Sequence, residues 1–353
     1  MEPVKAMRLC IYSTSFFPSI GGTEKASWLL ACEAHRNGHK VTIITETPAD
    51  SWINPIPEIE VIRKPSFHRL RRTYRDHDIL IINGGLSARA FLPAMYLPIK
   101  VVPLHAMITD GLRRSGSPKD RAGDQIRKLL ALNADCHVGV SRFVLKAAGV
   151  EGWVIPNMID PELLKWRDAL GPEDKEFDLI YAGRLERSKG LHELIEQLAE
   201  LHTAGISTRL LICGDGSSSE DLRKLTKARK LADFVQFDRA DSPEQLARFY
   251  ARSRSVVHTP LAKEGFGMTL IEGMAFGIPS VITNIPALPD TAGEAAWCLD
   301  TLQSENLKPV ITSIQNEDET YRQKAEYAAL RANQFTPAGV YQQWEQLFDE
   351  LLM

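Results

Sequence analysis

Short apolar segments typical of β-strands alternate with helical segments along nearly the whole chain, and this alternation constrains the fold more than any other feature. A strand over 8–13 leads through Gly21 and Gly22 into a helix over 23–37, and a second strand follows over 39–45. Strands separated by helices pair in parallel, and a parallel sheet is covered on both faces by helices. The sequence therefore predicts an α/β protein.

The alternation continues and then restarts after a polar segment at 173–176. Further strands of the first half are expected at 59–63, 79–83, 101–104 and 136–140. The second half is expected to have strands at 178–183, 209–213, 235–237, 255–259 and 280–283, with helices between them and at 318–335 and 337–352. A chain of 353 residues is long enough for two domains. We predict two Rossmann-like doubly wound domains that face each other across a cleft.

We place the first domain at 1–156 and the second at 157–336, with a carboxy-terminal helix at 337–353 completing the first. Apolar residues make up 44% of the chain and charged residues 25%, as in soluble globular proteins. No run of 18 apolar residues predicts a membrane span, and no signal peptide is recognised. The five cysteines are scattered without metal-ligand spacing, which favours reduced thiols in a cytoplasmic protein.

Residues 264–277 form the most informative motif. Glu264 and Glu272 are eight residues apart, around a glycine-bearing turn and the start of an apolar helix. Gly265 and Gly267 allow the backbone to approach a ligand closely, and a helix start offers unpaired N–H groups that suit a phosphate. A carboxylate at each end could hold sugar hydroxyls on both sides of a diphosphate.

A purely structural interpretation of Glu272 also exists. Thr269 followed three residues later by Glu272 fits a capping box, in which the carboxylate only satisfies a backbone amide. Both interpretations place Glu272 in the first turn of the helix.

Two cations follow the first strand of the second half. Gly183 ends that strand, Arg184 comes directly after it, and Lys189 lies five residues further on, just before a helix. A guanidinium and an ammonium beside a cleft can stabilise the charge that develops on a diphosphate leaving group.

Together these segments resemble the family-4 retaining glycosyltransferases, which have the two-domain GT-B fold and are described as glycosyltransferases of group 1. The resemblance implies that the donor-binding residues are Gly21, Gly22, Gly183, Arg184, Lys189, Gly214, Phe237, Asp238, Arg239, Glu264, Gly265, Phe266, Gly267, Met268, Thr269 and Glu272. Glu272 would hold the ribose. His105, which follows the strand at 101–104, would contact the sugar and join Glu264, Arg184 and Lys189 in the catalytic set.

The resemblance also implies a reaction in which the leaving phosphate oxygen takes the acceptor proton, with no metal and no cofactor required. The predicted function is transfer of a sugar from a nucleoside diphosphate sugar to a hydroxyl of a glycan or glycolipid in surface polysaccharide or lipopolysaccharide assembly. UDP-sugar is the expected donor, although the sequence does not choose among UDP, GDP and ADP. An epimerase or phosphorylase of the same fold, or a non-catalytic nucleotide-sugar-binding protein, are the alternatives.

Charge is unevenly distributed although the net charge is only −3. The first half has an excess of Lys and Arg, and the second half has an excess of Asp and Glu. The basic residues gather at Arg63, Lys64, Arg69, Arg71, Arg72 and Arg75, and again at Arg113, Arg114, Lys119, Arg121, Arg127 and Lys128. Such a face is usually just solvated, but it would also suit an anionic acceptor or the inner face of the cell membrane. Nucleic acid is not an expected partner.

Overall fold

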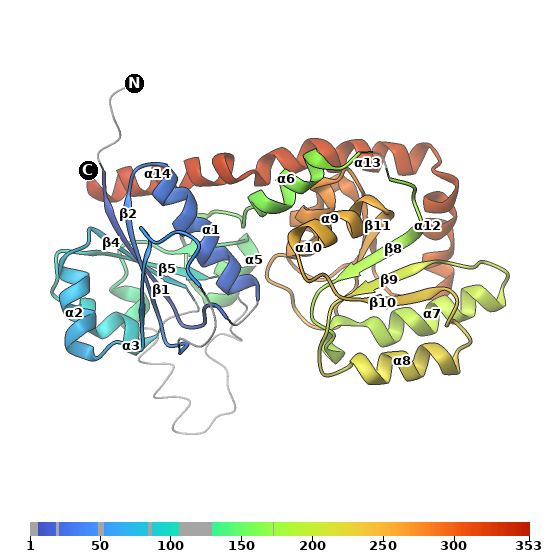
Figure 1. The fold of residues 1–353 in the computed structure, drawn as a ribbon, viewed down its shortest axis with the longest axis horizontal. Coiled ribbons are helices and arrows are strands. Elements are labelled where there is room, and N and C mark those ends of the chain that lie inside the picture. The colour runs from blue at the N-terminus through green and yellow to red at the C-terminus, as the bar shows by residue number, and fades with distance from the viewer. Residues whose placement is uncertain (1–5, 19–20, 49–52, 84–86, 106–128, 172) are drawn as a thin grey trace. The chain divides into compact units, whose positions relative to one another are not determined.

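The computed structural model describes residues 6–18, 21–48, 53–83, 87–105, 129–171 and 173–353. The chain divides into two compact units (Figure 1). The first unit comprises Met1–Met158 together with Pro337–Met353, and the second is Ile159–Thr336. The sequence analysis placed the boundary between residues 156 and 157, whereas the contacts within the chain divide after Met158.

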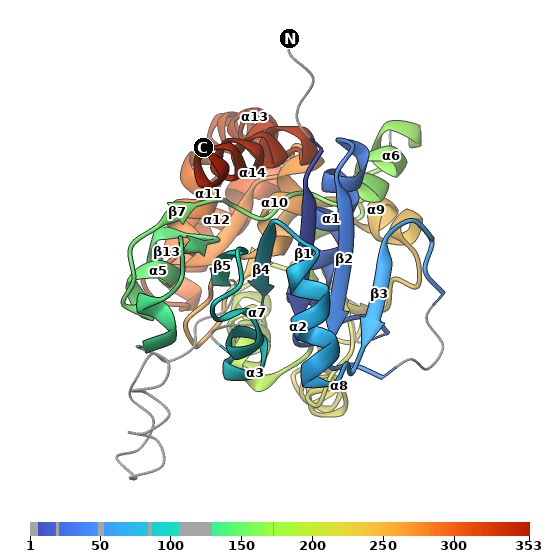
Figure 2. The ribbon, with the colours of Figure 1, turned by 90° about the vertical axis from the view of Figure 1, so that its left-hand side faces the viewer.

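The first unit contains a seven-stranded sheet in the order β3-β2-β1-β4-β5-β6-β7. Every neighbouring pair is parallel, and Figure 2 shows β3, β2, β1, β4 and β5 side by side. The strands are β1 (Arg8–Ser13), β2 (Lys40–Thr45), β3 (Glu60–Arg63), β4 (Ile79–Asn83), β5 (Lys100–His105), β6 (Val138–Gly139) and β7 (Trp153–Val154). The strand order reverses between β1 and β4, which creates the switch point at which such sheets bind ligands.

The helices of the first unit are α1 (Gly22–Arg36), α2 (Phe67–Arg75), α3 (Ala88–Phe91), η1 (Leu92–Ala94), α5 (Arg142–Ala148) and α14 (Pro337–Leu352). Helix α14 packs on α1 and buries an apolar stripe that includes Val340, Trp344 and Phe348. His39 accepts a hydrogen bond from the Met7 amide at 3.2 Å, and its Nε2 lies 4.0 Å from Oε1 of Glu345 on α14. The last helix therefore completes the core of the first unit.

The second unit contains a six-stranded parallel sheet in the order β10-β9-β8-β11-β12-β13. Its strands are β8 (Phe177–Ala182), β9 (Leu210–Cys213), β10 (Val235–Asp238), β11 (Ser253–His258), β12 (Ser280–Thr283) and β13 (Ala296–Leu299). Its helices are α6 (Pro161–Ala169), η2 (Arg187–Lys189), α7 (Leu191–Thr203), α8 (Ser219–Ala228), α9 (Pro243–Ala251), α10 (Met268–Ala275), α11 (Leu288–Ala292), η3 (Gly293–Ala295), α12 (Ser304–Asn316), α13 (Glu319–Ala332) and η4 (Asn333–Phe335).

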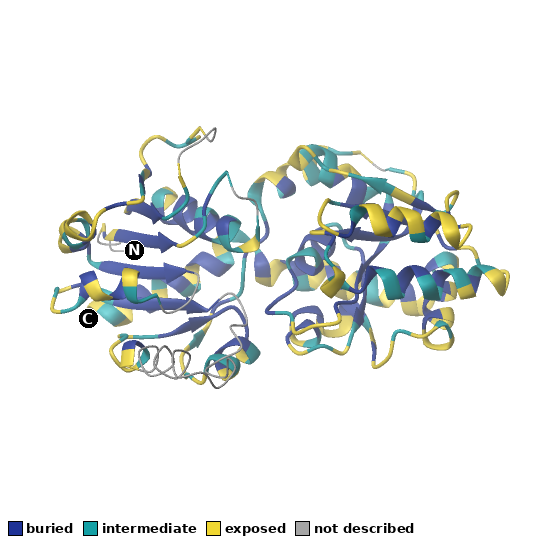
Figure 3. Ribbon diagram, turned by 90° about the horizontal axis from the view of Figure 1, so that it is seen from below, coloured by how far each residue is buried: buried dark blue, intermediate teal, exposed yellow. Residues whose placement is uncertain are grey.

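Burial follows the pattern expected for two doubly wound sheets. Strands of both units are drawn mostly in the colour of buried residues in Figure 3, while exposed residues lie on helices and loops. In β8 every residue from Phe177 to Ala182 is buried, because helices cover both faces of a central parallel strand. No helix within the described residues is long and apolar enough to cross a membrane.

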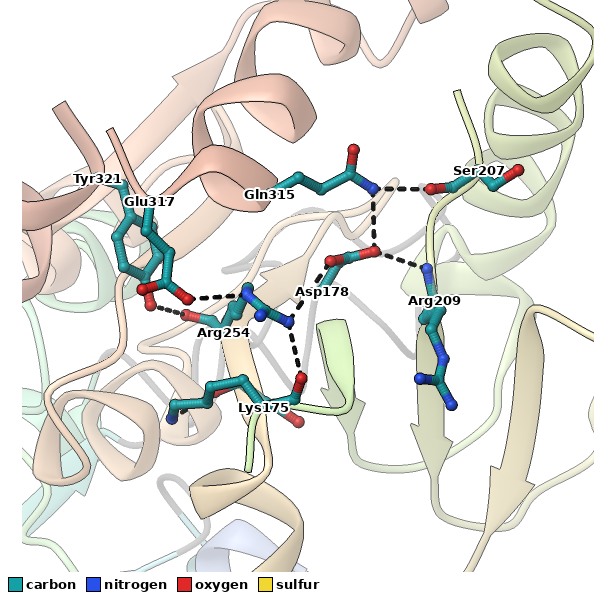
Figure 4. A network of polar contacts seen from close by, with 9 residues as sticks. Lys175, Asp178, Ser207, Arg209, Arg254, Gln315, Glu317 and Tyr321 are labelled. Carbon is teal, nitrogen blue, oxygen red and sulfur yellow. Dashed lines mark hydrogen bonds and ion pairs between the residues drawn. The ribbon is translucent and has the colours of Figure 1, made fainter. Parts of the chain in front are cut away.

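A polar network joins the amino ends of β8 and β11 to the segment between α12 and α13 (Figure 4). The Arg254 guanidinium donates to the Lys175 carbonyl oxygen at 2.9 Å and to Oε1 of Glu317 at 3.0 Å, and its Nη1 lies 3.9 Å from Oδ1 of Asp178. Oδ2 of Asp178 accepts from the Arg209 amide at 2.8 Å and from Gln315 Nε2 at 3.1 Å. These hydrogen bonds hold the amino ends of β8 and β11 in place.

Replacing Arg254 with alanine is expected to lower the free energy of unfolding of the second unit by about 2 kcal/mol, because partly buried acceptors lose a charged donor. Urea unfolding followed by tryptophan fluorescence measures the change. Arg322→Ala removes a solvent-exposed i,i+3 pair with Glu319 and serves as the matched control, with an expected loss below about 0.5 kcal/mol. Equal losses in the two variants would show that the network contributes no more than a surface ion pair.

Candidate active site

The predicted donor residues of the second unit lie at the carboxyl ends of adjacent strands. Gly183 follows β8, Gly214 follows β9, and the segment leading to Glu264 follows β11. Strand β8 is hydrogen-bonded to both β9 and β11, so these three loops leave the sheet side by side. Ligands bind at this edge in doubly wound folds.

Two glycines let these loops touch one another through their backbones. Gly214 has φ +153°, and a Cβ there would lie 1.9 Å from the Gly183 carbonyl oxygen. Gly190 has φ +74°, and a Cβ there would lie 1.9 Å from the Thr259 carbonyl oxygen. Because only glycine fits both the conformation and the space, the loop after β8 is held directly against the loops after β9 and β11.

Lys189 and Glu264 form an ion pair at the centre of this edge. Nζ of Lys189 lies 2.7 Å from Oε2 of Glu264, and the two side chains are only 19% and 22% exposed. The Leu261 amide also donates to the Ser188 carbonyl oxygen at 2.8 Å, which ties the two loops together next to the pair. The motif at 264–277 and the cation after β8 therefore meet in one cluster.

His258, the last residue of β11, is a member of this cluster that the sequence analysis missed. Its side chain is buried, with Nε2 3.4 Å from Oε2 of Glu264 and Nδ1 3.4 Å from the Thr269 hydroxyl. Burial alone would raise the Glu264 pKa, but His258 and Lys189 outweigh it and lower that pKa to about 2. Glu264 is therefore an ionised carboxylate near pH 7.

Arg184 does not join the ion pair between Lys189 and Glu264. Its exposed guanidinium lies 2.9 Å from Oε1 of Glu186, and its carbonyl oxygen accepts a hydrogen bond from the Tyr181 hydroxyl at 2.8 Å. The backbone at Arg184 is thus held by the sheet, while the charged end of the side chain extends into solvent.

Glu272 is held by a tyrosine from the preceding helix. The buried Glu272 carboxylate accepts a hydrogen bond from the Tyr250 hydroxyl of α9 at 2.8 Å. The burial of Tyr250 raises its pKa, and the nearby Glu272 carboxylate raises it further. Helix α10 begins at Met268 with Gly267 as its N-cap, so Thr269 is the second helical residue and not the cap that a capping box requires. Glu272 follows the first turn, and its expected place within that turn was wrong.

The remaining predicted donor residues of the second unit also lie near the carboxyl ends of the strands. Gly267 has φ +89°, which turns the chain into α10, and the buried Phe266 ring packs edge-on against Phe335 at 5.9 Å. Phe237 and Asp238 end β10, and Arg239 begins the loop that follows it. The Arg223 guanidinium lies 4.6 Å from the centre of the Phe237 ring. Gly265 precedes Phe266 in the turn after Glu264.

In the first unit, Gly21 and Gly22 begin α1 next to the switch point. Gly21 is the N-cap in an extended conformation, and the Asn83 side chain at the end of β4 donates to the Thr23 carbonyl oxygen at 3.1 Å and to the Ser27 hydroxyl at 2.7 Å. Asn83 is thus a buried anchor for the start of α1, a role that the sequence did not reveal.

His105 ends β5 and is buried against a second histidine. Its Nε2 lies 3.1 Å from Nδ1 of His137. The burial of His105 and, to a smaller extent, the neighbouring His137 lower the His105 pKa to about 4. His105 is therefore a neutral imidazole near pH 7. Among the described residues, no group of three or more His, Cys, Asp or Glu side chains could hold a metal ion.

Comparison with known proteins finds a family match within the second unit. Residues 164–331 match the sequence model of the family described as glycosyl transferases group 1. The O-antigen biosynthesis glycosyltransferase WclY of Escherichia coli is 29% identical over 185 residues, which is 50% of this chain and 50% of WclY. The chain thus spans about half the length of that relative.

Two further proteins are similar over more of the chain. Alpha-monoglucosyldiacylglycerol synthase of Streptococcus pneumoniae is 23% identical over 325 residues, covering 80% of this chain and 72% of that enzyme. The solved structure of Anabaena HepE in complex with UDP and glucose superposes with a TM-score of 0.75 over 97% of this chain and 99% of HepE, at 19% identity. Residues 164–331, which carry Lys189, Glu264 and Glu272, therefore resemble the glycosyl transferases group 1 family, and the protein has the GT-B fold.

Proposed function

We propose that the protein is a retaining glycosyltransferase that moves a sugar from a nucleoside diphosphate sugar, with UDP-sugar as the donor, to a hydroxyl of a glycan or glycolipid acceptor. The observation that carries the proposal is the ion pair of Lys189 and Glu264 at the carboxyl edge of the sheet in the group 1 domain. The named relatives are an O-antigen biosynthesis glycosyltransferase and an alpha-monoglucosyldiacylglycerol synthase, and the structure of HepE is a complex with UDP and glucose.

Lys189 and the start of α10 would stabilise the diphosphate leaving group. An ammonium has three donors, so Lys189 can keep its bond to Glu264 and still donate to phosphate oxygens. The turn through Gly267 presents the first amides of an eight-residue helix to the same edge. Arg184, whose guanidinium is in solvent, would reach the diphosphate by leaving Glu186.

Glu264 and Glu272 would hold the two ends of the donor. The ionised Glu264 accepts hydrogen bonds from sugar hydroxyls, and His258 and Lys189 orient its carboxylate. Glu272 is proposed to accept from the ribose hydroxyls while the Tyr250 hydroxyl holds one of its oxygens in place. His105 of the first unit keeps its predicted role as a contact of the transferred sugar.

The proposed reaction needs only the two substrates. The bond between the anomeric carbon and the phosphate oxygen breaks, the acceptor oxygen attacks the same face of the sugar, and the departing phosphate oxygen takes the acceptor proton. The products are the glycosylated acceptor and a nucleoside diphosphate. The reaction requires neither a metal nor another cofactor, and the protein contributes positioning and charge stabilisation.

A donor panel distinguishes this function from its alternatives. Thermal-shift measurements with UDP-, GDP- and ADP-sugars identify the donor, and release of nucleoside diphosphate is then measured with and without a glycan or glycolipid acceptor. Acceptor-dependent release supports the transferase. Conversion of the nucleotide sugar without release indicates an epimerase, phosphate-dependent formation of a sugar phosphate indicates a phosphorylase, and binding without turnover indicates a non-catalytic protein.

Glu272→Gln is expected to weaken donor binding by about tenfold while changing the melting temperature little, because the amide oxygen still accepts from Tyr250. Calorimetric titration with the nucleoside diphosphate gives the affinity. Tyr250→Phe is the converse control, since it removes the same hydrogen bond and is expected to cost about 1 kcal/mol of stability. A Glu272→Gln protein that loses stability but keeps its affinity would make this glutamate structural.

An anionic acceptor at the membrane surface is proposed from the basic face of α2. A hollow of about 680 Å³ lies between α2 and the amino ends of β2 and β3. Its lining includes the basic residues Lys40, Arg69 and Arg72 and the acidic residues Glu60 and Asp76. The Arg63 and Arg71 guanidinium groups are already used, since they donate to backbone carbonyl oxygens of Phe17 and Met95. The expected contributions of Arg113, Arg114 and Arg121 concern residues outside those that the structure describes.

Vesicles that contain acidic phospholipid are therefore expected to bind the protein at low salt and to release it as the salt approaches physiological strength. Arg69→Gln with Arg72→Gln should reduce this binding by about thirtyfold, at roughly 1 kcal/mol for each of the two charges. The control is Arg322→Gln, which changes an exposed arginine of the second unit. Salt-insensitive binding, or equal loss in the control, would contradict the proposal. The proposed location is cytoplasmic, at the inner face of the cell membrane.

A further inference from the structure

Two buried histidines of the first unit form a hydrogen-bonded chain that ends on a backbone carbonyl. Nε2 of His105 lies 3.1 Å from Nδ1 of His137, and Nε2 of His137 lies 3.1 Å from the Ala131 carbonyl oxygen. His105 ends β5 and His137 directly precedes the neighbouring β6, so the sheet itself holds the two rings together, with centroids 5.2 Å apart. The two histidine residues are 5% and 9% exposed.

The carbonyl oxygen of Ala131 determines which ring nitrogens of His137 and His105 carry a proton. A carbonyl oxygen only accepts, so Nε2 of His137 must carry its hydrogen. Burial lowers the pKa of both histidines, and a neutral His137 then has an unprotonated Nδ1. The hydrogen between the two rings therefore belongs to Nε2 of His105, which leaves Nδ1 of His105 unprotonated.

We propose that His137 is a positioning residue that holds His105 in the tautomer with its proton on Nε2, so that Nδ1 of His105 accepts a hydrogen bond from a substrate hydroxyl. The identity of that hydroxyl, a group of the transferred sugar, rests on the proposed function. The tautomer itself does not, because it follows from His105, His137 and Ala131 alone.

In the neutral ring, this arrangement makes Nδ1 of His105 an acceptor. A hydroxyl is both donor and acceptor, and it can bind the lone pair without any proton leaving the protein. Without His137 the His105 ring would divide between two tautomers. The tautomer with hydrogen on Nδ1 could donate to the hydroxyl oxygen but could no longer accept the hydroxyl hydrogen. Loss of His137 would therefore remove one oriented hydrogen bond to the substrate, which corresponds to a turnover lower by about fivefold to tenfold.

The tautomer is tested directly by long-range ¹H–¹⁵N correlation spectra of the uniformly ¹⁵N-labelled full chain at pH 7. His105→Gln and His137→Gln spectra assign the two rings. We expect His105 to show a protonated Nε2 and an unprotonated Nδ1. A His105 ring protonated on Nδ1, or on both nitrogens, overturns the proposal whether or not the protein turns over any nucleotide sugar.

Two substitutions of His137 test the positioning role. His137→Phe keeps a ring but removes the acceptor, and we expect mixed His105 tautomers and a fivefold to tenfold lower kcat, with unchanged affinity for the nucleoside diphosphate. His137→Asn places an amide oxygen near the position of Nδ1, and we expect it to recover the single tautomer and most of kcat. The positioning role is wrong if His137→Phe leaves the His105 spectrum and kcat unaltered. It is also wrong if a folded His137→Asn protein recovers neither the single tautomer nor kcat.

The proposed function can fail separately from this inference. If no donor is turned over but the spectra show the expected tautomer, the transferase proposal fails and the histidine chain stands. If turnover is present but the tautomer is wrong, the transferase proposal stands and the role of His137 fails.

Discussion

Replacing Lys189 with alanine is expected to lower kcat/KM for sugar transfer by about 10²-fold or more while the protein stays folded. The ammonium is the partly buried cation of the cluster, 2.7 Å from Glu264, and a preorganised cation acts most strongly where charge develops on the leaving group. Initial rates of nucleoside diphosphate release measure the effect, and circular dichroism checks the fold. Arg184→Ala is expected to change the rate in the same direction.

The control for this experiment is Lys308→Ala on α12. Lys308 is an exposed lysine of the same unit, and the substitution removes one positive charge without touching the carboxyl edge of the sheet. A folded Lys189→Ala protein that keeps the activity of the Lys308→Ala protein would remove Lys189 from the reaction.

Glu264→Gln is expected to reduce kcat by about 10²-fold, since a neutral amide loses the charge-assisted hydrogen bonds to sugar hydroxyls and leaves Lys189 without its anionic partner. The same initial-rate measurement gives kcat, with the donor chosen by thermal shift. Unaltered kinetics with that donor would mean that Glu264 only holds Lys189 in place.

The same substitution has a defined effect on the pH dependence of stability. The Glu264 pKa is about 2 in the folded protein against a model-compound value of 4.5. A depressed folded-state pKa adds stability that is fully present above pH 4.5 and is lost as the pH falls from there to about 2. The parent should therefore lose roughly 3 kcal/mol more than Glu264→Gln across this window. Urea unfolding at pH 7, 4.5 and 3 measures the difference between the two proteins, which should reach about 2 kcal/mol at pH 3.

Much of the fold could be predicted because parallel α/β domains repeat a local pattern. Apolar runs indicated β1, β2 and β4, and the restart after Lys175 indicated a second sheet. Helix α12 was not predicted, because Pro309 and the β-branched residues after it disfavour a helix. Packing against α7 buries one side of α12 and overrides that local preference. Helix α6 was also not predicted, although Asp160 at its N-cap and Pro161 at its first position are local signals of a helix start.

The candidate site was predictable in its members but not in its contacts. Glu264, Glu272 and Lys189 were found from motif spacing, yet their hydrogen-bond partners were not. Lys189 and Glu264 are 75 residues apart, and they meet because β8 and β11 are neighbours in the sheet. His258 lay within a strand that reads as a buried apolar element, so its chemical role had no local signal.

The sequence by itself determined which residue types stand at the ends of the strands, because the period of each element and the position of each glycine are local properties. Only the tertiary structure decided how those residues act. The Glu264 charge, the Tyr250 bond to Glu272 and the proton on His105 all depend on burial and on partners from other strands or helices. Protonation and hydrogen-bond direction follow from the environment of a group, and that environment exists only after distant segments have packed together.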